Sequence, residues 1–262
     1  MKAFIQIKEN GDWLNENCYS SADGFFRMGY DIVKFKLSDT RQVPFQHSIF
    51  KQFDKREDVA HGGIVAMRNL FDRFGVPQPE IHNPHEYLLE ATGRTFCERK
   101  LNDVVLEFMN DEWNEMNPVF IKPLTEHKLF TGFVVNSFSD LIKINHIDTE
   151  TMILQSSVSN FISEYRVFIN RQGIMGCKNY TGDYRVLPDF ELVERAIEDY
   201  GNYPNTPLSY SLDFAITDKG ETQLIEINDG FGLGAYGLNP IYYCKMIRDR
   251  WHQIISDGLK YT

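Results

Sequence analysis

The first 75 residues alternate between strand-like and helix-like patterns. Apolar and β-branched runs at 2–7 and 31–37 predict strands, and the segment between them predicts a helix that ends near Gly29. A strand or turn at 61–63 comes before a second helical pattern, which Gly75 closes. Strands that alternate with helices are typical of a small parallel α/β unit.

The pattern changes after a segment with three prolines at 76–87, which we interpret as a linker. Further on, the sequence predicts strands at 118–124, 131–141 and 151–157, helices at 99–109 and 190–200, and hairpins at 163–180 and 209–229. Consecutive hairpins with intervening helices indicate antiparallel lobes, so the expected fold class is α+β.

Composition narrows the function classes. The 262 residues carry a net charge of −10, which disfavours non-specific binding to nucleic acid or to an anionic membrane. The four cysteines show neither metal-ligand spacing nor a disulfide framework. The chain has no apolar run long enough for a membrane span and no signal-peptide pattern at its start. We therefore expect a soluble, cytoplasmic protein.

The last hairpin contains an unusual strand, LIEIND at 224–229. A two-residue loop at 219–220, or a four-residue loop over the same centre, pairs positions whose numbers sum to 439, which places Asp213 opposite Glu226 on one face. Asn228 lies one step along that face. The opposite face, directed toward the core, takes Leu212, Phe214, Ile225 and Ile227.

Two facing carboxylates repel each other unless a cation lies between them. Asp213, Glu226 and an amide oxygen from Asn228 suit a hard divalent ion such as Mg²⁺. An ordinary solvent-exposed polar face is the alternative interpretation of this hairpin.

The preceding hairpin gathers cations. A three-residue loop ending at Gly173 places Arg166 opposite Lys178, an arrangement that is favourable around an anion. Lys122 ends an apolar run just before Pro123. Arg166 and Lys178 taken singly are equally consistent with surface residues, whereas a surface lysine is less expected at position 122. Carboxylates, an amide and converging cations together indicate a receptor for a metal-bound polyphosphate.

On these residues the chain resembles the ATP-grasp superfamily over roughly residues 90 to 240, and within it a group found in phages and bacteria. The resemblance implies two α+β lobes, at about 95–155 and 160–262, that clasp ATP in a domain over 86–262. A small α/β domain over 1–85 precedes them. By the same resemblance, Asp213, Glu226 and Asn228 hold Mg²⁺ (or Mn²⁺) ions that bridge the ATP phosphates.

The resemblance also implies nucleotide contacts. Lys122, in the motif FIKP, and the pair Arg166 and Lys178 face the phosphates, and the last two act in catalysis. The adenine contacts are expected at Gln155, Ser156 and Val158. Family members often carry a glycine-rich loop over the phosphates, but residues 124–132 hold a single glycine, which leaves Lys128 as the expected phosphate contact there.

ATP-grasp enzymes mostly join a carboxylate to an amine through an acyl phosphate, so the resemblance implies an ADP-forming ligase, with amino acids and peptides as candidate substrates. The glycine-rich segment 229–237 could bind a substrate carboxylate through Gly230, Gly232 and Gly234, or form a flexible turn. A small-molecule kinase and a non-catalytic nucleotide-binding protein remain as alternative functions. The oligomeric state is not indicated.

Overall fold

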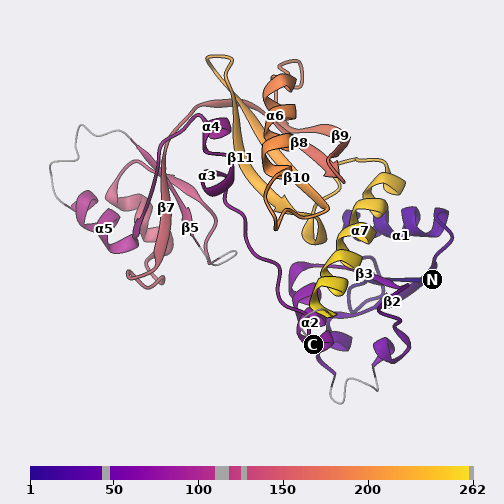
Figure 1. Cartoon of the computed structure of the whole chain (residues 1–262). Helices are drawn as coiled ribbons and strands as arrows, with labels where there is room; N and C mark the ends of the chain where they lie inside the picture. Colours follow the sequence, from indigo (N-terminus) through magenta and orange to yellow (C-terminus); the bar gives the residue numbers. More distant parts are fainter. Residues whose placement is uncertain (43–47, 110–117, 125–128, 260–262) are drawn as a thin grey trace.

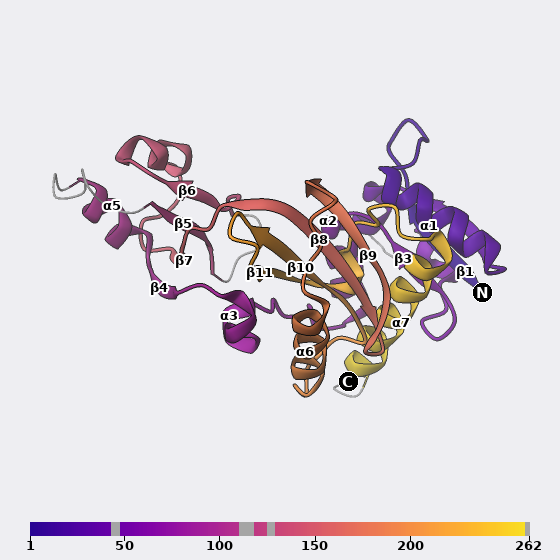
Figure 2. The ribbon, with the colours of Figure 1, turned by 90° about the horizontal axis from the view of Figure 1, so that it is seen from above.

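The structure is a computed structural model that describes residues 1–42, 48–109, 118–124 and 129–259. Three β-sheets follow one another across the molecule, with the N-terminal unit at one end and the sheet of β4–β7 at the other (Figures 1 and 2). The sheet of β8–β11 lies between them. In the part of the chain that the structure describes, no helix combines the length and the apolarity needed to cross a bilayer.

The N-terminal unit is the predicted parallel α/β unit. Its elements are β1 (Lys2–Gln6), α1 (Glu16–Arg27), β2 (Asp31–Phe35), β3 (Val59–His61) and α2 (Ile64–Phe74), with 3-10 helices at Leu37–Arg41 and Ile49–Gln52. The sheet order is β2-β1-β3, and both pairings are parallel. Gly75 ends α2 in the left-handed conformation, with φ of 67°, as expected of a helix-closing glycine.

The long helix α7 (Pro240–Leu259) packs onto this N-terminal unit rather than extending from the last sheet (Figure 1). Trp251 of α7 stacks on Phe71 of α2 at 5.6 Å between ring centroids and meets Phe53 edge-on at 5.7 Å. The core of the N-terminal unit is therefore built from both halves of the chain. The apolar face of α7 completes this core, while the boundary at residue 85 stays a prediction.

The sheet at the far end has the order β4-β7-β5-β6, and its pairings are antiparallel. The chain reaches this end through two short helices, α3 (Pro84–Tyr87) and α4 (Leu89–Thr92), which pack against the sheet of β8–β11. The unit around the far-end sheet consists of β4 (Phe96–Lys100), α5 (Leu101–Met109), β5 (Val119–Pro123), β6 (Phe133–Val135), a 3-10 helix at Phe138–Ile144 and β7 (Met152–Ser157). The helix predicted from residue 99 begins at Leu101, because residues 96–100 pair with β7 instead. The strand predicted over 131–141 ends at Val135.

The sheet between the other two has the order β11-β10-β8-β9 and is antiparallel. Its elements are β8 (Phe161–Asn170), β9 (Gly173–Gly182), α6 (Phe190–Gly201), β10 (Ser209–Thr217), β11 (Thr222–Asp229) and a 3-10 helix at Gly230–Gly232. Helix α6 covers one face, and its buried Val193, Ile197 and Tyr200 pack in the same core as Leu212 and Phe214. The opposite face carries Phe168, which is buried in the core shared with the N-terminal unit, and polar side chains that include Arg166 and Asp213.

The two hairpins of this sheet have the predicted residue pairs, but their loops differ in length from those predicted. The β10–β11 loop has three residues, 218–220, and the β8–β9 loop has two, Arg171 and Gln172, both with positive φ. Each loop alone would shift its register by one position. A β-bulge at Ile225 and another at Met175 restore the pairs Asp213–Glu226 and Arg166–Lys178.

The bulge at Ile225 also changes which residue enters the core. Leu224 is fully buried there, whereas Ile225, which we expected in the core, lines a pocket on the polar face. Two consecutive side chains, Ile225 and Glu226, therefore face the same way, which an unbroken strand does not allow.

Candidate active site

Four charged residues form a row across the sheet of β8–β11. Their order is Glu226, Asp213, Arg166 and Lys178, one from each strand, and each is directly opposite the next. Residues that are directly opposite in an antiparallel sheet place their side chains on one face. The row therefore runs from two acidic to two basic groups.

The two central members form a buried ion pair. Arg166 donates from Nε and Nη2 to the two carboxylate oxygens of Asp213, at 2.8 and 2.6 Å, and the side chains are only 8% and 2% exposed. Burial raises the pKa of Asp213 to about 6, although Arg166 opposes that shift, so the carboxylate is ionised at neutral pH. Burial alone would lower the pKa of Arg166, but the hydrogen bonds to Asp213 raise it.

We expected a cation between the carboxylates of Asp213 and Glu226, and in this structure the guanidinium of Arg166 is that cation. Arg166 Nη2 also lies 3.9 Å from Glu226, whose side chain is 54% exposed. Asn228 donates to Glu226 at 3.1 Å and to Asp213 at 3.4 Å. Two carboxylates and the remaining amide oxygen are a donor set that fits a hard divalent ion, and such an ion would compete with Arg166 for both acids.

A pocket of about 560 Å³ opens between this face and the sheet of β4–β7. Its apolar side includes Phe96, Phe120 and Leu154, and its polar side includes Glu164 and Glu226. Tyr180, at a third bulge, also lines the pocket and donates a hydrogen bond to Glu164 at 2.7 Å. Bulges thus turn two side chains, Ile225 and Tyr180, toward the pocket.

Two cations in the pocket make no ion pair with a carboxylate in the part of the chain that the structure describes. Lys122 was expected there, whereas Arg94 was missed. Among the described residues neither makes an ion pair, the Nε of Arg94 is buried without a hydrogen bond, and burial lowers the pKa of both side chains. Cations that have lost water and gained no counter-ion favour an anionic ligand. Nothing in the local pattern of the sequence distinguishes Arg94 from a surface arginine.

The other predicted nucleotide contacts divide into two groups. Ser156 and Val158 line the pocket as expected. Gln155 does not: its side chain lies on the opposite face of β7 and accepts a hydrogen bond from Arg99 at 3.3 Å, because neighbouring strand residues alternate faces. Lys178 lies beside Arg166 but is not among the described residues that line the pocket. Lys128 lies outside the described residues.

A second pocket of about 340 Å³ adjoins the first and shares Lys122, Thr131, Gly132 and Glu226 with it. Of the three glycines expected to bind substrate, only Gly232 lines it. Gly230 is packed so tightly that a Cβ would lie 2.4 Å from the carbonyl oxygen of Ser209, which gives it a structural role. Gly234 lies against the ring of Tyr236. The two pockets form one cleft with Glu226 at their junction.

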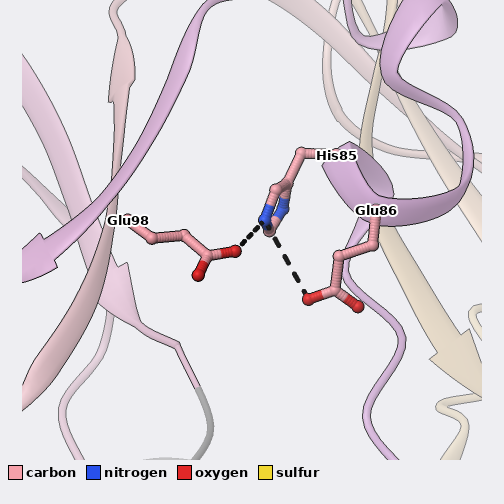
Figure 3. A group of neighbouring side chains, drawn as sticks. All are labelled: His85, Glu86 and Glu98. Atoms are coloured by element: carbon pink, nitrogen blue, oxygen red, sulfur yellow. Dashed lines mark hydrogen bonds and ion pairs between the residues drawn. The ribbon is translucent and has the colours of Figure 1, made fainter.

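A separate cluster joins helix α3 to strand β4 beside this cleft. The Nε2 of His85 lies 3.0 Å from Glu98 and 3.9 Å from Glu86 (Figure 3). The His85 ring also stacks on Phe96, at 5.3 Å between centroids. Because Nδ1 is buried without a partner, the cluster lacks the second hydrogen bond that usually orients a metal-bound imidazole. We therefore assign it a structural role in supporting the pocket wall.

Comparison with known families decides the classification. The family model described as the ATP-grasp domain, R2K clade family 2, matches residues 92–246, which is more than half of the chain. This chain belongs to the ATP-grasp proteins. The matched range contains the charged row, Lys122, Arg94 and both bulges that face the pocket. A comparison with curated protein sequences gave no match.

Solved structures of other ATP-grasp proteins share the fold. A D-alanine–D-alanine ligase from Bacillus anthracis aligns with a TM-score of 0.55 at 15% identity, over 98% of this chain and 99% of the other. A RimK domain protein from Sphaerobacter thermophilus aligns with a TM-score of 0.58 at 14% identity, over 95% of this chain and 98% of the other. N5-carboxyaminoimidazole synthetase from Staphylococcus aureus aligns with a TM-score of 0.58 at 12% identity, over 95% of this chain and 78% of the other. At these identities the likeness concerns the fold.

Proposed function

We propose that this ATP-grasp protein is an ATP- and Mg²⁺-dependent ligase that joins a carboxylate to an amine and releases ADP and phosphate. The observation that carries the proposal is the row of two acids and two bases beside a pocket with two cations that have no counter-ion among the described residues. Phosphoryl transfer needs little covalent chemistry from the protein, but it needs positioning and neutralisation of charge. This row supplies both.

The larger pocket is proposed to hold the nucleotide. Phe96, Phe120 and Leu154 offer an apolar slot of the kind that takes a purine, and Glu164 can accept hydrogen bonds from ribose hydroxyls. Arg94 and Lys122 would then face the phosphates and recover the counter-charge that they lack.

The γ-phosphate is proposed to lie over the charged row. Asp213, Glu226 and Asn228 would hold the metal ion, which neutralises phosphate charge when bound. Arg166 and Lys178 would stabilise the phosphoryl group as the substrate carboxylate attacks the γ-phosphorus and ADP leaves. The amine nitrogen then attacks the acyl carbon, phosphate leaves, and the nitrogen loses a proton to form the amide.

The smaller pocket is proposed to hold the substrates. It adjoins Glu226, and the glycine-rich turn brings the backbone at Gly232 to its wall. The similar structures include a D-alanine–D-alanine ligase and a macrocyclase bound with its precursor peptide. We accordingly propose an amino acid or a peptide as the substrate class.

The test is an ADP-release screen with MgATP over amino acids and short peptides, tried singly and in pairs. A ligase gives ADP and an amide only when both a carboxylate and an amine are present. A stable phosphorylated product without an amine would assign a kinase instead. ATP binding without turnover on any acceptor would leave a nucleotide-binding protein.

A binding measurement tests the nucleotide pocket without knowledge of the substrate. Arg94→Ala and Lys122→Ala should each weaken ADP binding about tenfold in calorimetry, because a charge-assisted contact to phosphate is lost. Lys219→Ala, at an exposed hairpin loop, is the matched control and should bind as the wild type does. Unchanged affinity for ADP in both pocket variants would show that the phosphates do not bind in this pocket.

A further inference from the structure

Tyr236 has a backbone conformation that is unusual for an aromatic residue. Its φ is 44°, in the left-handed region, and the following Gly237 has a φ of 74°. Glycine tolerates this region, but a bulky side chain there is strained and persists only where its surroundings hold it. The strain at Tyr236 therefore calls for a contact that compensates for it.

That contact is with Arg166. The ring of Tyr236 lies over the guanidinium of Arg166, at 4.7 Å from the ring centroid, and 5.3 Å from the ring of Tyr180. A Cβ at Gly234 would lie 2.9 Å from the Tyr236 ring, so the glycine makes room for it. Arg166 is thus held at its edge by Asp213 and at its face by Tyr236.

The loop that carries Tyr236 is fixed on either side of its glycines. Asp229 pairs with Arg250, the carbonyl of Leu233 accepts a hydrogen bond from Tyr243 at 2.5 Å, and the amide of Ala235 donates to Asn17 at 2.9 Å. The residue Tyr236 is nonetheless 49% exposed. Rotation of this side chain away from Arg166 therefore leaves the tethers of the loop in place.

The position of Arg166 matters for the metal site. Both oxygens of Asp213 accept hydrogen bonds from Arg166, and Asp213 is 1% exposed. A divalent ion between Asp213 and Glu226 has to displace Arg166 from at least part of this contact, since like charges cannot share it. Whatever holds Arg166 in place then weakens binding of the metal.

We propose that Tyr236 is a positioning residue that holds Arg166 on Asp213 and keeps the metal site closed until a metal-bound nucleotide displaces the ring. The proposal rests on the proposed function of Asp213 and Glu226 as metal ligands. It predicts that loss of the ring tightens metal-dependent binding. A ring that contacts the ligand directly would give the opposite sign.

The test compares Tyr236→Asn with Tyr236→Phe. Asparagine tolerates the left-handed conformation but removes the ring, whereas phenylalanine keeps the ring. Calorimetry with MgADP should show about two- to fivefold tighter binding for Tyr236→Asn, the range expected for loss of one partly exposed cation–π contact. ADP in EDTA should bind both variants as it binds the wild type, and Tyr236→Phe should restore the wild-type affinity for MgADP.

Mn²⁺ alone, titrated by electron paramagnetic resonance, separates this proposal from the proposed function. Tighter Mn²⁺ binding by Tyr236→Asn supports the Tyr236 proposal even if the wild type binds no nucleotide. The control is Tyr184→Asn, at a tyrosine that is 72% exposed and should leave every affinity unchanged. Weaker MgADP binding by Tyr236→Asn, an equal change with and without metal, or no Mn²⁺ binding by any variant would each overturn the proposal.

Discussion

The central and the edge strands of the sheet of β8–β11 carry the same charged row but in different environments. On the central strands β10 and β8, Asp213 and Arg166 are buried and paired with each other. On the edge strands β11 and β9, the side chain of Glu226 is 54% exposed and Lys178 is half-buried. The comparison shows that members of one row can differ in their contribution to stability: the buried inner pair is part of the folded core, whereas the outer residues are accessible from solvent.

The largest effect is expected when the inner pair is broken. Arg166→Met should lower the free energy of unfolding by about 3–5 kcal/mol, because it leaves Asp213 as an uncompensated buried charge. The double variant Arg166→Met with Asp213→Leu should regain most of that loss. Chemical denaturation followed by circular dichroism measures both. A loss below about 1 kcal/mol for the single variant would show that the pair is not part of the core.

At acidic pH the stability measurements also report on His61, which is buried. Its Nδ1 lies 2.9 Å from the hydroxyl of Ser21 and its Nε2 lies 3.3 Å from the hydroxyl of Tyr243. Burial lowers the pKa of His61 to about 4. His61 therefore binds a proton more readily in the unfolded chain than in the folded one. Protonation of the unfolded chain lowers the free energy of unfolding as the pH falls from about 6.5 toward 4, and above pH 6.5 this loss is absent. The expected loss is about 3 kcal/mol.

Thermal unfolding at a series of pH values checks this expectation. His61→Gln should flatten the slope between pH 6.5 and 4, whereas His146→Gln, at an exposed position, should keep it. An unaltered slope in His61→Gln would assign the acid sensitivity to another group. The strand comparison is best made above pH 6.5, where His61 is neutral.

The outer acid should affect turnover and not stability. Glu226→Gln should reduce metal-dependent ADP release by at least about 100-fold, comparable with loss of one preorganised electrostatic contact. Its free energy of unfolding should stay within about 0.5 kcal/mol of the wild type, because the side chain is largely in solvent. Glu221→Gln, at an exposed position of the same hairpin, is the control. Wild-type turnover in Glu226→Gln would remove Glu226 from the metal site.

The smallest effect is expected at Lys178. Lys178→Met should lower turnover by roughly tenfold or less, since Arg166 keeps the main positive charge at that place. Stability should change little, because the side chain of Lys178 makes no ion pair or hydrogen bond with any of the described residues. ADP-release kinetics and denaturation on the same preparation measure the two quantities. A loss as large as that of Glu226→Gln would give Lys178 a direct role in the reaction.

The sequence predicted which charges face each other, although it did not predict the loops that set the registers. Each loop length was wrong by one residue, and the bulges at Ile225 and Met175 compensated for it. Alternation along a strand cannot reveal a bulge, because packing against the core and the pocket determines where the extra residue fits. The misplacement of Ile225 in the expected core has this cause.

Other features of the site depend on contacts between distant segments. The cation Arg94 becomes notable only because the fold places it beside Lys122 in the pocket. Gln155 lies on the other face of β7 because strand residues alternate faces, and there it meets Arg99 from a distant segment. The patterns of the N-terminal unit, by contrast, predicted β1, α1, β2, β3 and α2, since these elements are set by local periodicity. Long-range burial accounts for the parts of the site that were missed.

The packing of α7 on the N-terminal unit affects how the chain folds during its synthesis. Strands β1–β3 emerge from the ribosome long before Trp251, and at about 5–20 residues per second the delay is on the order of ten seconds. Throughout that interval Phe71 and Phe53 lack the contacts that Trp251 makes with them in the folded protein. The core of the N-terminal unit is therefore complete only after α7 has been synthesised.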